Sequence, residues 1–240
     1  MYTNQNAKES NMKEAVVELK DATLAYNKDY CALNCVSLVL NQGDRIAIEG
    51  EYGCGKTSFL RVIANLEQLK SGECLLNGRA VTQVDFAHDI SLGFLSRDPV
   101  FFEYRTVKSN LEWVLKSRGI VKEEREGIIM RTLEECDLVS LVNKKIRWLS
   151  KVEKRLVQIA RLLLRPIDVL LCDEILEEFD TVDQNSIISI LKLVLKKSSN
   201  CVVVFACTNA KLYQEFSPKL YYLKYGVLSK HGESDEADIQ

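Results

Sequence analysis

Apolar and polar residues alternate along much of residues 16–40, and this period of two is typical of half-buried β-strands. The turn at 41–44 then leads into a short β-rich run. Strands are predicted at 16–20, 22–26, 36–40, 44–49, 70–79 (a hairpin with turns at Gly72 and Gly78) and 90–95. We expect the strands at 16–20, 22–26 and 36–40 to form a small antiparallel sheet that leads into the strand at 44–49.

The apolar spacing becomes helical after Arg97, where Val107, Leu111 and Leu115 recur at helical intervals. Helices are predicted at 57–66, over most of 106–142, at 151–165 (ended by Pro166) and at 185–197. Further strands are predicted at 168–174 and 201–207, with a closing hairpin at 220–229. Apolar strands that alternate with helices predict an α/β fold with a mainly parallel sheet.

The segment at 50–58, between the strand at 44–49 and the first helix, has the pattern G-x-x-x-x-G-K-[ST]. Its glycines allow backbone N–H groups to approach phosphate oxygens without obstruction by a Cβ atom. Lys56 is predicted to reach the β- and γ-phosphates, and the Thr57 hydroxyl is predicted to ligate Mg²⁺. Strand, glycine loop and helix N-terminus form the arrangement that phosphate binding requires, which favours a nucleotide site over an ordinary turn.

Two carboxylates follow the apolar run at 169–172. Asp173 ends this predicted buried strand, where an acidic side chain can hold Mg²⁺ through water. Glu174 comes next and can polarise an attacking water as general base. The alternative is a pair of acidic residues that begins a surface loop, and the nearby phosphate-loop pattern favours the functional interpretation.

Composition sets the limits of the fold and of its partners. A chain of 240 residues with 47% hydrophobic residues can bury a sizeable core in one large domain or two lobes. The 32 basic and 34 acidic residues are interspersed, which argues against nucleic-acid binding through a broad basic surface. Residues 1–13 are predicted to form a flexible leader and residues 232–240 an acidic, disordered tail.

Cysteine usage and hydropathy indicate the compartment. The eight cysteines include no C-x-x-C pair and there are only two histidines, so buried free thiols in a reducing cytosol fit better than disulfides or a zinc site. The N-terminus is polar, and the chain has no run of about 18 apolar residues. We therefore expect a soluble chain that is neither secreted nor membrane-spanning.

Over about residues 15–231 these segments together resemble the ATP-binding subunit of ABC transporters. Residues 50–58 match the family's Walker A motif and 169–173 its Walker B motif, with Glu174 in the place of the catalytic glutamate. The resemblance implies a P-loop NTPase of the ABC type, with a mainly parallel core sheet, a small antiparallel β subdomain and a helical subdomain. It implies one domain at 14–231, with a core lobe at about 14–96 and 158–231 and a helical lobe at about 97–157.

Other motifs of the family follow in order. Tyr26, or alternatively Tyr30, stands where the family has an aromatic residue that stacks on adenine. Ser150 begins the signature motif, residues 93–99 fit the Q-loop, and Asp180 fits the end of the D-loop. The nucleotide-binding residues implied are Tyr26, Gly50, Gly53, Cys54, Gly55, Lys56, Thr57, Ser58, Arg97, Ser150, Asp173 and Asn209, with Thr57 and Asp173 also holding Mg²⁺ and Glu174 catalytic. The implied partners are an integral membrane transporter subunit and a second cassette, identical or different, which would attach the chain peripherally to the membrane from the cytoplasm.

Several functional positions depart from the family pattern. Arg97 replaces the Q-loop glutamine, and a guanidinium has no acceptor for Mg²⁺ or water; its side chain is expected either to pair with a phosphate or to point to solvent. The residues after Ser150 are Lys-Val-Glu instead of two glycines and glutamine, and Asn209 replaces the H-loop histidine. The loss of the family's proline from 175–179 is a milder change.

Because the phosphate loop and Asp173 are intact, nucleotide binding should outlast hydrolysis. The favoured function is an ATP-binding subunit that couples MgATP binding and slow hydrolysis to a membrane-spanning partner. The alternative is a regulatory or structural pseudo-ATPase without useful turnover, and a soluble ABC protein of translation or DNA repair is the third hypothesis. Phe101, Phe102 and Tyr104 either line the groove for the partner's coupling helix or belong to the core beneath the helical lobe.

Overall fold

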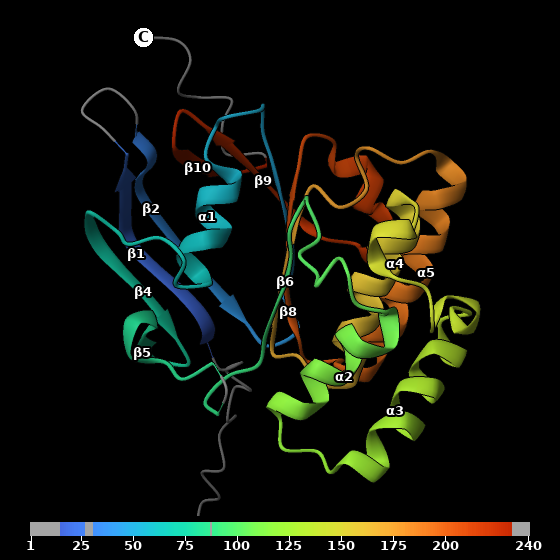
Figure 1. The fold of residues 1–240 in the computed structure, drawn as a ribbon. Helices are drawn as coiled ribbons and strands as arrows, with labels where there is room; N and C mark the ends of the chain where they lie inside the picture. The colour runs from blue at the N-terminus through green and yellow to red at the C-terminus, as the bar shows by residue number, and fades with distance from the viewer. Residues whose placement is uncertain (1–14, 27–30, 87, 232–240) are drawn as a thin grey trace, which may run out of the picture.

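The computed structural model describes residues 15–26, 31–86 and 88–231. The predicted leader at 1–13, the predicted tail at 232–240 and Tyr30 lie outside these ranges. Within them the strands form two sheets, one of four strands and one of six. Figure 1 shows the two sheets on either side of one helix, with the remaining α-helices gathered against the far face of the larger sheet.

The smaller sheet is antiparallel, as predicted. Its order is β2 (Cys31–Asn41), β1 (Ala15–Ala25), β4 (Ser71–Leu76) and β5 (Arg79–Ala80). The prediction of two separate strands at 16–20 and 22–26 was wrong, because β1 runs through Asp21. Asp21 takes a positive φ of 46° at a shift in the pairing register, and its N–H donates to Ser37 Oγ at 2.9 Å. The irregularity is thus accommodated as a bulge.

The larger sheet is mainly parallel, which confirms the predicted fold class. Its order is β10 (Val227–Lys230), β9 (Lys219–Lys224), β3 (Arg45–Glu49), β8 (Val202–Cys207), β7 (Val169–Asp173) and β6 (Leu92–Leu95). All these pairs are parallel except the β9–β10 hairpin. The carboxyl ends of β3 and β7 therefore lie on the same edge of the sheet, which brings residues 50–58 close to Asp173.

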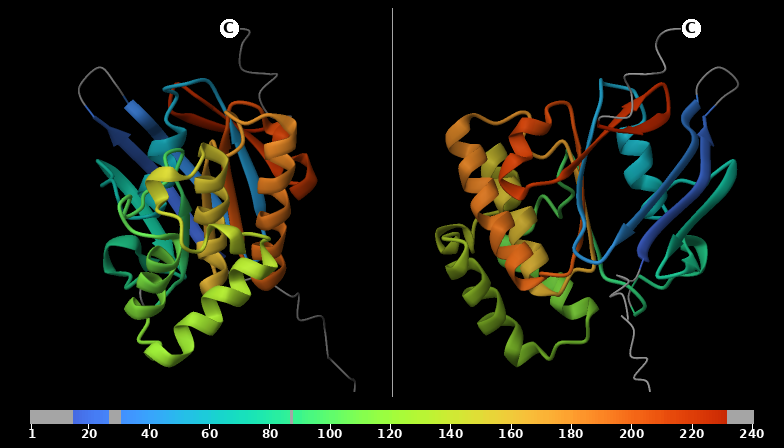
Figure 2. Two further views of the ribbon diagram at one scale, coloured as in Figure 1. Left: turned by 45° about the vertical axis from the view of Figure 1, so that its right-hand side comes forward. Right: turned by 180° about the vertical axis from the view of Figure 1, so that it is seen from behind.

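Successive side chains of the central strands pack into two hydrophobic cores, one on each face of the larger sheet. Along β8, Val202 and Val204 pack toward α1 (Lys56–Ile63) and the antiparallel sheet, whereas Val203 and Phe205 pack toward the other helices. This is the two-residue period of a strand that is buried on both faces, and it explains why the strand is apolar throughout. The right panel of Figure 2 shows α1 between the two sheets.

The helices largely follow the predicted pattern, with shifted ends. They are α2 (Val107–Ser117), α3 (Lys122–Glu135), α4 (Lys151–Ala160) and α5 (Thr181–Lys197), and the 3₁₀ turns are Val81–Gln83, Val139–Leu141, Ile146–Trp148, Arg161–Leu164 and Ala210–Phe216. The predicted helix at 151–165 changes to a 3₁₀ turn after Ala160, and α5 begins at Thr181 rather than at 185. Asp180 causes the earlier start, because its carboxylate accepts the Asp183 N–H at 2.9 Å as an N-cap.

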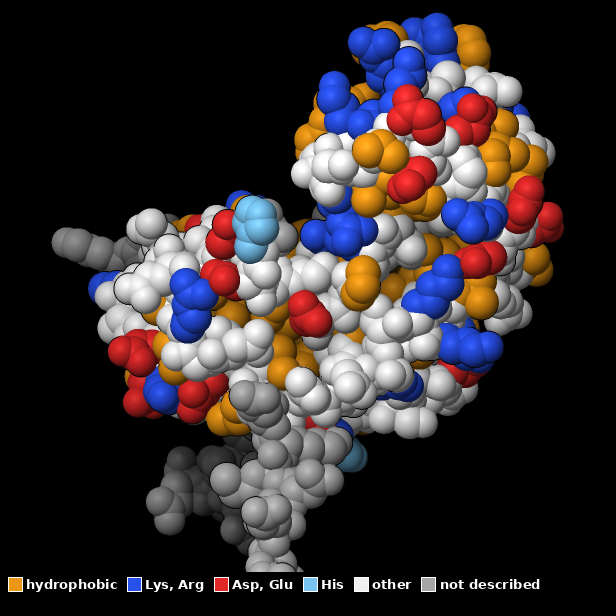
Figure 3. All heavy atoms as spheres, turned by 90° about the horizontal axis from the view of Figure 1, so that it is seen from below, with side chains coloured by type: hydrophobic (Ala, Val, Ile, Leu, Met, Phe, Trp, Pro, Cys, Tyr) orange, Lys and Arg blue, Asp and Glu red, His pale blue; other side chains and the backbone are white. Residues whose placement is uncertain are grey.

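None of the described helices is long and apolar enough to cross a membrane. The face seen in Figure 3 carries basic, acidic and apolar side chains intermingled over much of its area. All eight cysteines are free, and Cys74, Cys136, Cys172, Cys201 and Cys207 are buried. The expectation of buried thiols was wrong for Cys31 and Cys35, which are exposed on β2, and Cys54 is intermediate.

Candidate functional site

The glycine loop at 50–58 connects β3 to α1, and two of its glycines are required by close backbone contacts. Gly55 has a φ of 110°, and a Cβ atom there would lie 2.1 Å from the carbonyl oxygen of Ala32 on β2. A Cβ atom at Gly50 would lie 2.5 Å from the carbonyl oxygen of Leu223 on β9. Gly53 has a φ of 79° but open space around it. The loop is therefore packed between both sheets and held in a conformation that side chains would block.

The ammonium group of Lys56 lies inside the curve of this loop. Its Nζ donates to the carbonyl oxygens of Gly50 at 2.7 Å and Glu51 at 2.9 Å. It also lies 3.3 Å from Glu174 Oε1, and only 3% of the lysine side chain is exposed. A buried ammonium surrounded by the main chain of a glycine loop is the donor arrangement that suits a phosphate chain.

Thr57 and Asp173 meet although 116 positions separate them in the sequence. The Thr57 hydroxyl lies 3.1 Å from Oδ1 and 3.0 Å from Oδ2 of the aspartate, and can donate to either oxygen. Burial raises the pKa of the Asp173 carboxyl, and the hydrogen bond from Thr57 opposes that effect. A hydroxyl beside a carboxylate at a phosphate loop fits Mg²⁺, which is commonly held by one or two protein oxygens together with water and substrate phosphates.

The Glu174 carboxylate is held between two cations. Lys56 lies 3.3 Å from Oε1, and Arg97 Nη1 lies 3.4 Å from Oε2. Glu174 has a positive φ of 47°, and its N–H donates to the Ala206 carbonyl of β8 at 2.9 Å. The backbone conformation and the ion pairs together aim this carboxylate at the phosphate loop.

Arg97 contacts other residues of the site. Its guanidinium is half exposed, but it is paired with Glu174 and lies 5.5 Å from the ring centre of Tyr52 in the phosphate loop. The expectation of a solvent-directed side chain was therefore wrong. The pairing of Arg97 with a phosphate stays a prediction, because a guanidinium has donors left for a second anion.

Three other predicted residues lie at the edge of the loop. The Tyr26 hydroxyl is 3.1 Å from Ser58 Oγ, while about half of the tyrosine side chain area is exposed (51%). The Cys54 Sγ atom lies 4.0 Å from Lys56 Nζ. The position of Tyr26 beside α1 leaves a large part of its ring accessible, as stacking on a base requires.

The signature segment forms a helix cap at the start of α4. Ser150 Oγ accepts the Glu153 N–H at 3.2 Å, and Glu153 Oε2 accepts the Ser150 N–H at 2.7 Å, which makes a capping box. The hydrogen bond from Ser150 lowers the pKa of the Glu153 carboxyl, which also lies 3.3 Å from Lys144 Nζ. Lys151 does not offset this charge, because its Nζ pairs with Glu178 at 2.5 Å. The helix start already carries an anionic group of its own.

Asn209 follows β8 and is exposed. Its Oδ1 accepts the Lys211 N–H at 3.1 Å, so that it caps the 3₁₀ turn Ala210–Phe216. It lies one residue from Thr208, whose N–H donates to Glu177 at 3.4 Å.

Sequence reasoning missed two charged groups near this site, a partly buried carboxylate and a fully buried guanidinium. The carboxylate of Glu177 also accepts the Tyr213 hydroxyl at 2.9 Å, and burial raises its pKa. Arg155 on α4 is fully buried. A charge within the mainly apolar run at 155–159 was the signal available for Arg155, whereas nothing local links Glu177 to Tyr213.

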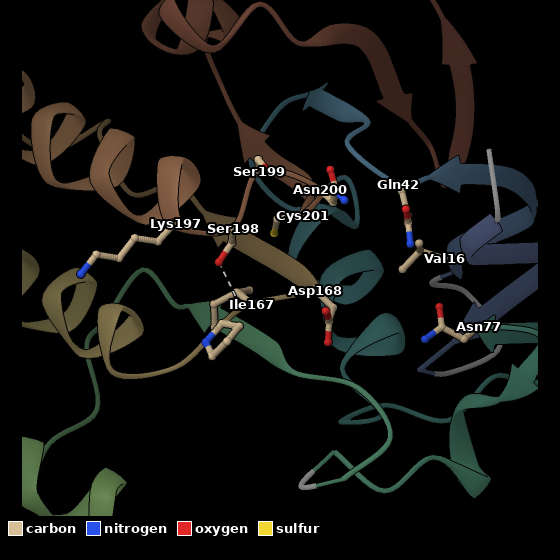
Figure 4. A pocket seen from close by; sticks show the side chains of 11 residues that line it. Val16, Gln42, Asn77, Ile167, Asp168, Lys197, Ser198, Ser199, Asn200 and Cys201 are labelled. Carbon is tan, nitrogen blue, oxygen red and sulfur yellow. Dashed lines mark hydrogen bonds between the residues drawn. The ribbon is translucent and has the colours of Figure 1, made fainter. Parts of the chain in front are cut away.

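A cavity of about 270 Å³ lies away from these residues, and Figure 4 shows the side chains that line it. Its lining includes Gln42, Asp168 and Cys201, which stand just before β3, β7 and β8. Because those strands are parallel, the cavity lies at the sheet edge opposite the phosphate loop. Asp168 accepts the Ser91 N–H at 2.7 Å, and Ser198 Oγ accepts the Ile167 N–H at 3.0 Å, so these polar groups link β7 to the segments around it.

A glycine loop between strand and helix, a buried lysine and a threonine–aspartate pair define a nucleotide-binding protein of the P-loop class. The family model described as ABC transporter matches residues 33–177, and the chain belongs to this family. Its members bind ATP, with Mg²⁺ as the usual cofactor. The resemblance inferred from the sequence motifs is thereby confirmed.

Two curated relatives illustrate the similarity. The sn-glycerol-3-phosphate import ATP-binding protein UgpC of Rhizobium meliloti is 33% identical over 69% of this chain and 47% of its own length. The spermidine/putrescine import ATP-binding protein PotA of Haemophilus influenzae is 26% identical over 92% of this chain and 59% of its own length. The chain thus spans about half the length of the curated relatives it matches.

The fold agrees with solved cassettes. The dimeric ATP-binding cassette MJ0796, in a post-hydrolysis state with ADP and Pi, superposes with a TM-score of 0.77 at 24% identity. The match covers 89% of this chain and 98% of that one. This likeness confirms the ABC-type P-loop fold.

Proposed function

We propose that this chain is the ATP-binding subunit of an ABC transporter, which binds MgATP on the loop at 50–58 and hydrolyses it slowly with Glu174 as general base. The observation that carries the proposal is the convergence of the Thr57–Asp173 pair with Lys56 and Glu174. A hydroxyl–carboxylate pair, a buried ammonium and a second carboxylate thus meet at one edge of the sheet, which supports the proposed roles in binding Mg²⁺, phosphate and the attacking water. The pseudo-ATPase alternative finds no support in the comparisons, whose relatives are import ATP-binding proteins.

Each residue of the loop has a distinct part in this proposal. Lys56 and the loop N–H groups would hold the phosphates, Thr57 and Asp173 would hold Mg²⁺, and the exposed ring of Tyr26 would stack on adenine. When bound, Mg²⁺ would neutralise charge on the phosphate oxygens. Glu174 would accept a proton from the attacking water.

The partners of Glu174 support the slow turnover that we propose. A carboxylate paired with two cations is a poorer hydrogen-bond acceptor for water than a free one. The side chain of Arg97 also lacks the carbonyl group that the family's glutamine side chain provides. In the head-to-tail pairing proposed below, the Glu153 carboxylate of the capping box would lie close to the partner's phosphate and repel it. If each change costs about 1.4 kcal/mol at the transition state, each slows hydrolysis about tenfold.

We also propose a head-to-tail pairing with a second cassette, in which Ser150 faces the partner's nucleotide, and attachment to a membrane-spanning subunit from the cytoplasmic side. Phe102 and Tyr104 are 52% and 74% exposed on the segment before α2, whereas Phe101 packs against the helical core. The exposed pair supports a docking surface for the membrane subunit. UgpC and PotA are both import proteins but for different solutes, so we propose uptake as the direction and assign no solute.

The test compares Lys56→Ala and Glu174→Gln with Lys192→Ala, which removes a half-exposed lysine far from the loop in sequence. ATP affinity is measured by titration with a fluorescent ATP analogue, and turnover by phosphate release, alone and with a partner cassette. Lys56→Ala should lose at least about tenfold in affinity, a change of about 1.4 kcal/mol. Glu174→Gln should keep the affinity and lose about 10²–10⁴ in rate.

Two outcomes would oppose the proposal. Normal ATP affinity in Lys56→Ala would exclude the loop at 50–58 as the nucleotide site. An unchanged rate in Glu174→Gln, with binding lost in Lys56→Ala, would leave an ATP-binding module in which Glu174 is not the base.

A further inference from the structure

The guanidinium of Arg155 is buried where three segments meet. The side chain is fully buried on α4. Its Nη1 donates to the Ser96 carbonyl at 2.6 Å, and its Nη2 donates to the Arg97 carbonyl. The guanidinium carbon lies 5.9 Å from the ring centre of Phe179, which precedes α5.

The surroundings of Arg155 are costly for a cation. Its hydrogen-bond acceptors are neutral: two carbonyl oxygens and the side-chain oxygen of Gln158 at 2.6 Å. Its Nε has no hydrogen-bond partner among the described residues, and burial lowers the pKa of the guanidinium. A buried charge without an ion-pair partner generally gives little net stability compared with a well-packed apolar residue. The main effect of the Arg155 guanidinium is therefore to fix the main chain that it hydrogen-bonds, rather than to add stability.

The contacts of Arg155 continue through Arg97 to Glu174, the candidate catalytic carboxylate. Arg97 is bound twice: its carbonyl by Arg155 and its side chain by Glu174, 3.4 Å away. Phe179, on the other side of Arg155, belongs to the short segment between Glu174 and α5. Arg155 also lies on the helix that Ser150 caps. The signature helix and Glu174 are thus connected through Arg155 and Arg97.

We propose that Arg155 is a positioning residue that fixes the main chain of Arg97 and so holds the Arg97 guanidinium against Glu174. A movement of α4 at the cassette interface would then change the ion pairing of Glu174. This inference rests on the proposed function, because it assigns a regulator of the same hydrolytic site. Arg155 itself touches no residue of the phosphate loop in the contacts described.

The competing explanation is that Arg155 only anchors α4 to the core, and Arg165 provides a matched control for it. Arg165 Nη2 donates to the Leu92 carbonyl at 2.5 Å, at the start of β6. Arg155 binds the two carbonyls that follow the end of the same strand. Burial lowers the pKa of the Arg165 guanidinium as well. Because Arg165 is less buried than Arg155, the two variants are compared by where exchange changes and by whether the change in kcat depends on Arg97, not by their loss of stability.

The experiment compares Arg155→Met, Arg155→Lys and Arg165→Met with the unmodified full chain. The first measurement is hydrogen–deuterium exchange without nucleotide, followed in the peptide that covers 93–99. Arg155→Met should speed exchange there by about tenfold or more, while Arg165→Met should leave residues 96–99 within about twofold of wild type. Lysine carries one compact charge and cannot bridge both carbonyls, so Arg155→Lys should resemble Arg155→Met.

The second measurement is ATP turnover in single and double variants. Loosening Arg97 should free Glu174, so Arg155→Met should raise kcat by about three- to tenfold with KM for ATP within about twofold. In an Arg97→Gln background the same change should alter kcat by less than about twofold, because residues that act through one another are not additive. Equal effects of Arg155→Met and Arg165→Met, or an undiminished effect in the Arg97→Gln background, would overturn the proposal.

The exchange measurement separates failure of this inference from failure of the proposed function. If no variant hydrolyses ATP, the hydrolytic part of the proposed function fails, and exchange at 96–99 still decides the position of Arg155. If Arg155→Met does not fold, Arg155→Lys supplies the same comparison with the charge retained. If residues 96–99 of Arg155→Lys exchange as slowly as in the wild type, the charge alone is enough to hold this segment, and the bridging role of Arg155 is overturned.

Discussion

Arg97 Nη1 lies 3.4 Å from Glu174 Oε2, while Lys56 Nζ lies 3.3 Å from the other carboxylate oxygen. Each oxygen of the candidate general base therefore faces its own cation. The two contacts differ in environment, because the Lys56 side chain is 3% exposed and that of Arg97 is 48% exposed. The contact with Arg97 is consequently the weaker and more easily exchanged of the two.

Replacement of Arg97 by glutamine should increase ATP turnover. The change removes one cation from Glu174 and introduces a carbonyl acceptor where the family has one. We expect kcat to rise by about tenfold, or about 1.4 kcal/mol, with little change in ATP affinity. Phosphate release checks the rate, with Arg147→Gln as an exposed control. A fall in kcat would show instead that Arg97 assists the reaction, as an arginine finger does.

Alanine at two glycines of the loop should have unequal effects. Both Gly53 and Gly55 have positive φ, so each substitution incurs about 1–2 kcal/mol of backbone strain. A Cβ at Gly55 would also meet the Ala32 carbonyl at 2.1 Å, whereas nothing lies within 4 Å at Gly53. Gly55→Ala should therefore lower the urea midpoint and the ATP affinity further than Gly53→Ala does. Equal losses would contradict the close packing of the loop against β2.

The hydroxyl of Thr57 should contribute to ATP binding only when Mg²⁺ is present. Thr57→Ala should weaken MgATP binding by about tenfold or more, and Thr57→Ser should retain most of it because the hydroxyl beside Asp173 is kept. ATP binding in EDTA should be nearly the same for all three proteins. A loss of equal size in EDTA would mean that Thr57 acts on the fold of the loop rather than on the metal.

The partly buried carboxyl of Glu177 should make stability depend on pH. Burial raises its pKa above the ordinary value of 4.5, so its contribution to stability is full below about pH 4.5 and is lost as pH rises through the folded pKa. Glu177→Gln carries no such charge, and its stability relative to wild type should therefore increase between about pH 4 and pH 7. Urea unfolding at several pH values measures the difference, with Glu124→Gln at an exposed position of α3 as control. A difference that does not vary with pH would contradict the raised pKa.

Thiol reactivity should divide the cysteines by burial. Cys31 and Cys35 are exposed and should react rapidly with a disulfide reagent such as DTNB. Burial raises the pKa of Cys74 and Cys201 to about 12, so these thiols should react only after unfolding. Reaction kinetics in native buffer and in urea, followed by mass mapping, check this. Rapid native labelling of Cys201 would contradict its burial just before β8.

The sequence by itself determined the local chemistry and the fold class of this protein. The phosphate loop is contiguous, its glycines and Lys56 lie within seven positions, and Asp173 and Glu174 end an apolar strand that can only be buried. Periodicity also located the sheet strands and helices, because it records which face of each element is buried. Periodicity did not fix the element ends, because the bulge at Asp21 and the cap at Asp180 depend on one or two local side-chain hydrogen bonds.

Only the tertiary structure decided the partners of the charged side chains. Three such pairs join residues that lie between 36 and 77 positions apart: Arg97 with Glu174, Arg155 with the carbonyl of Arg97, and Glu177 with Tyr213. A residue type states which bonds a side chain can make, but the partner it meets depends on how distant segments pack. The intact loop therefore indicated a working nucleotide site, and the packing around Glu174 showed which cations restrain it.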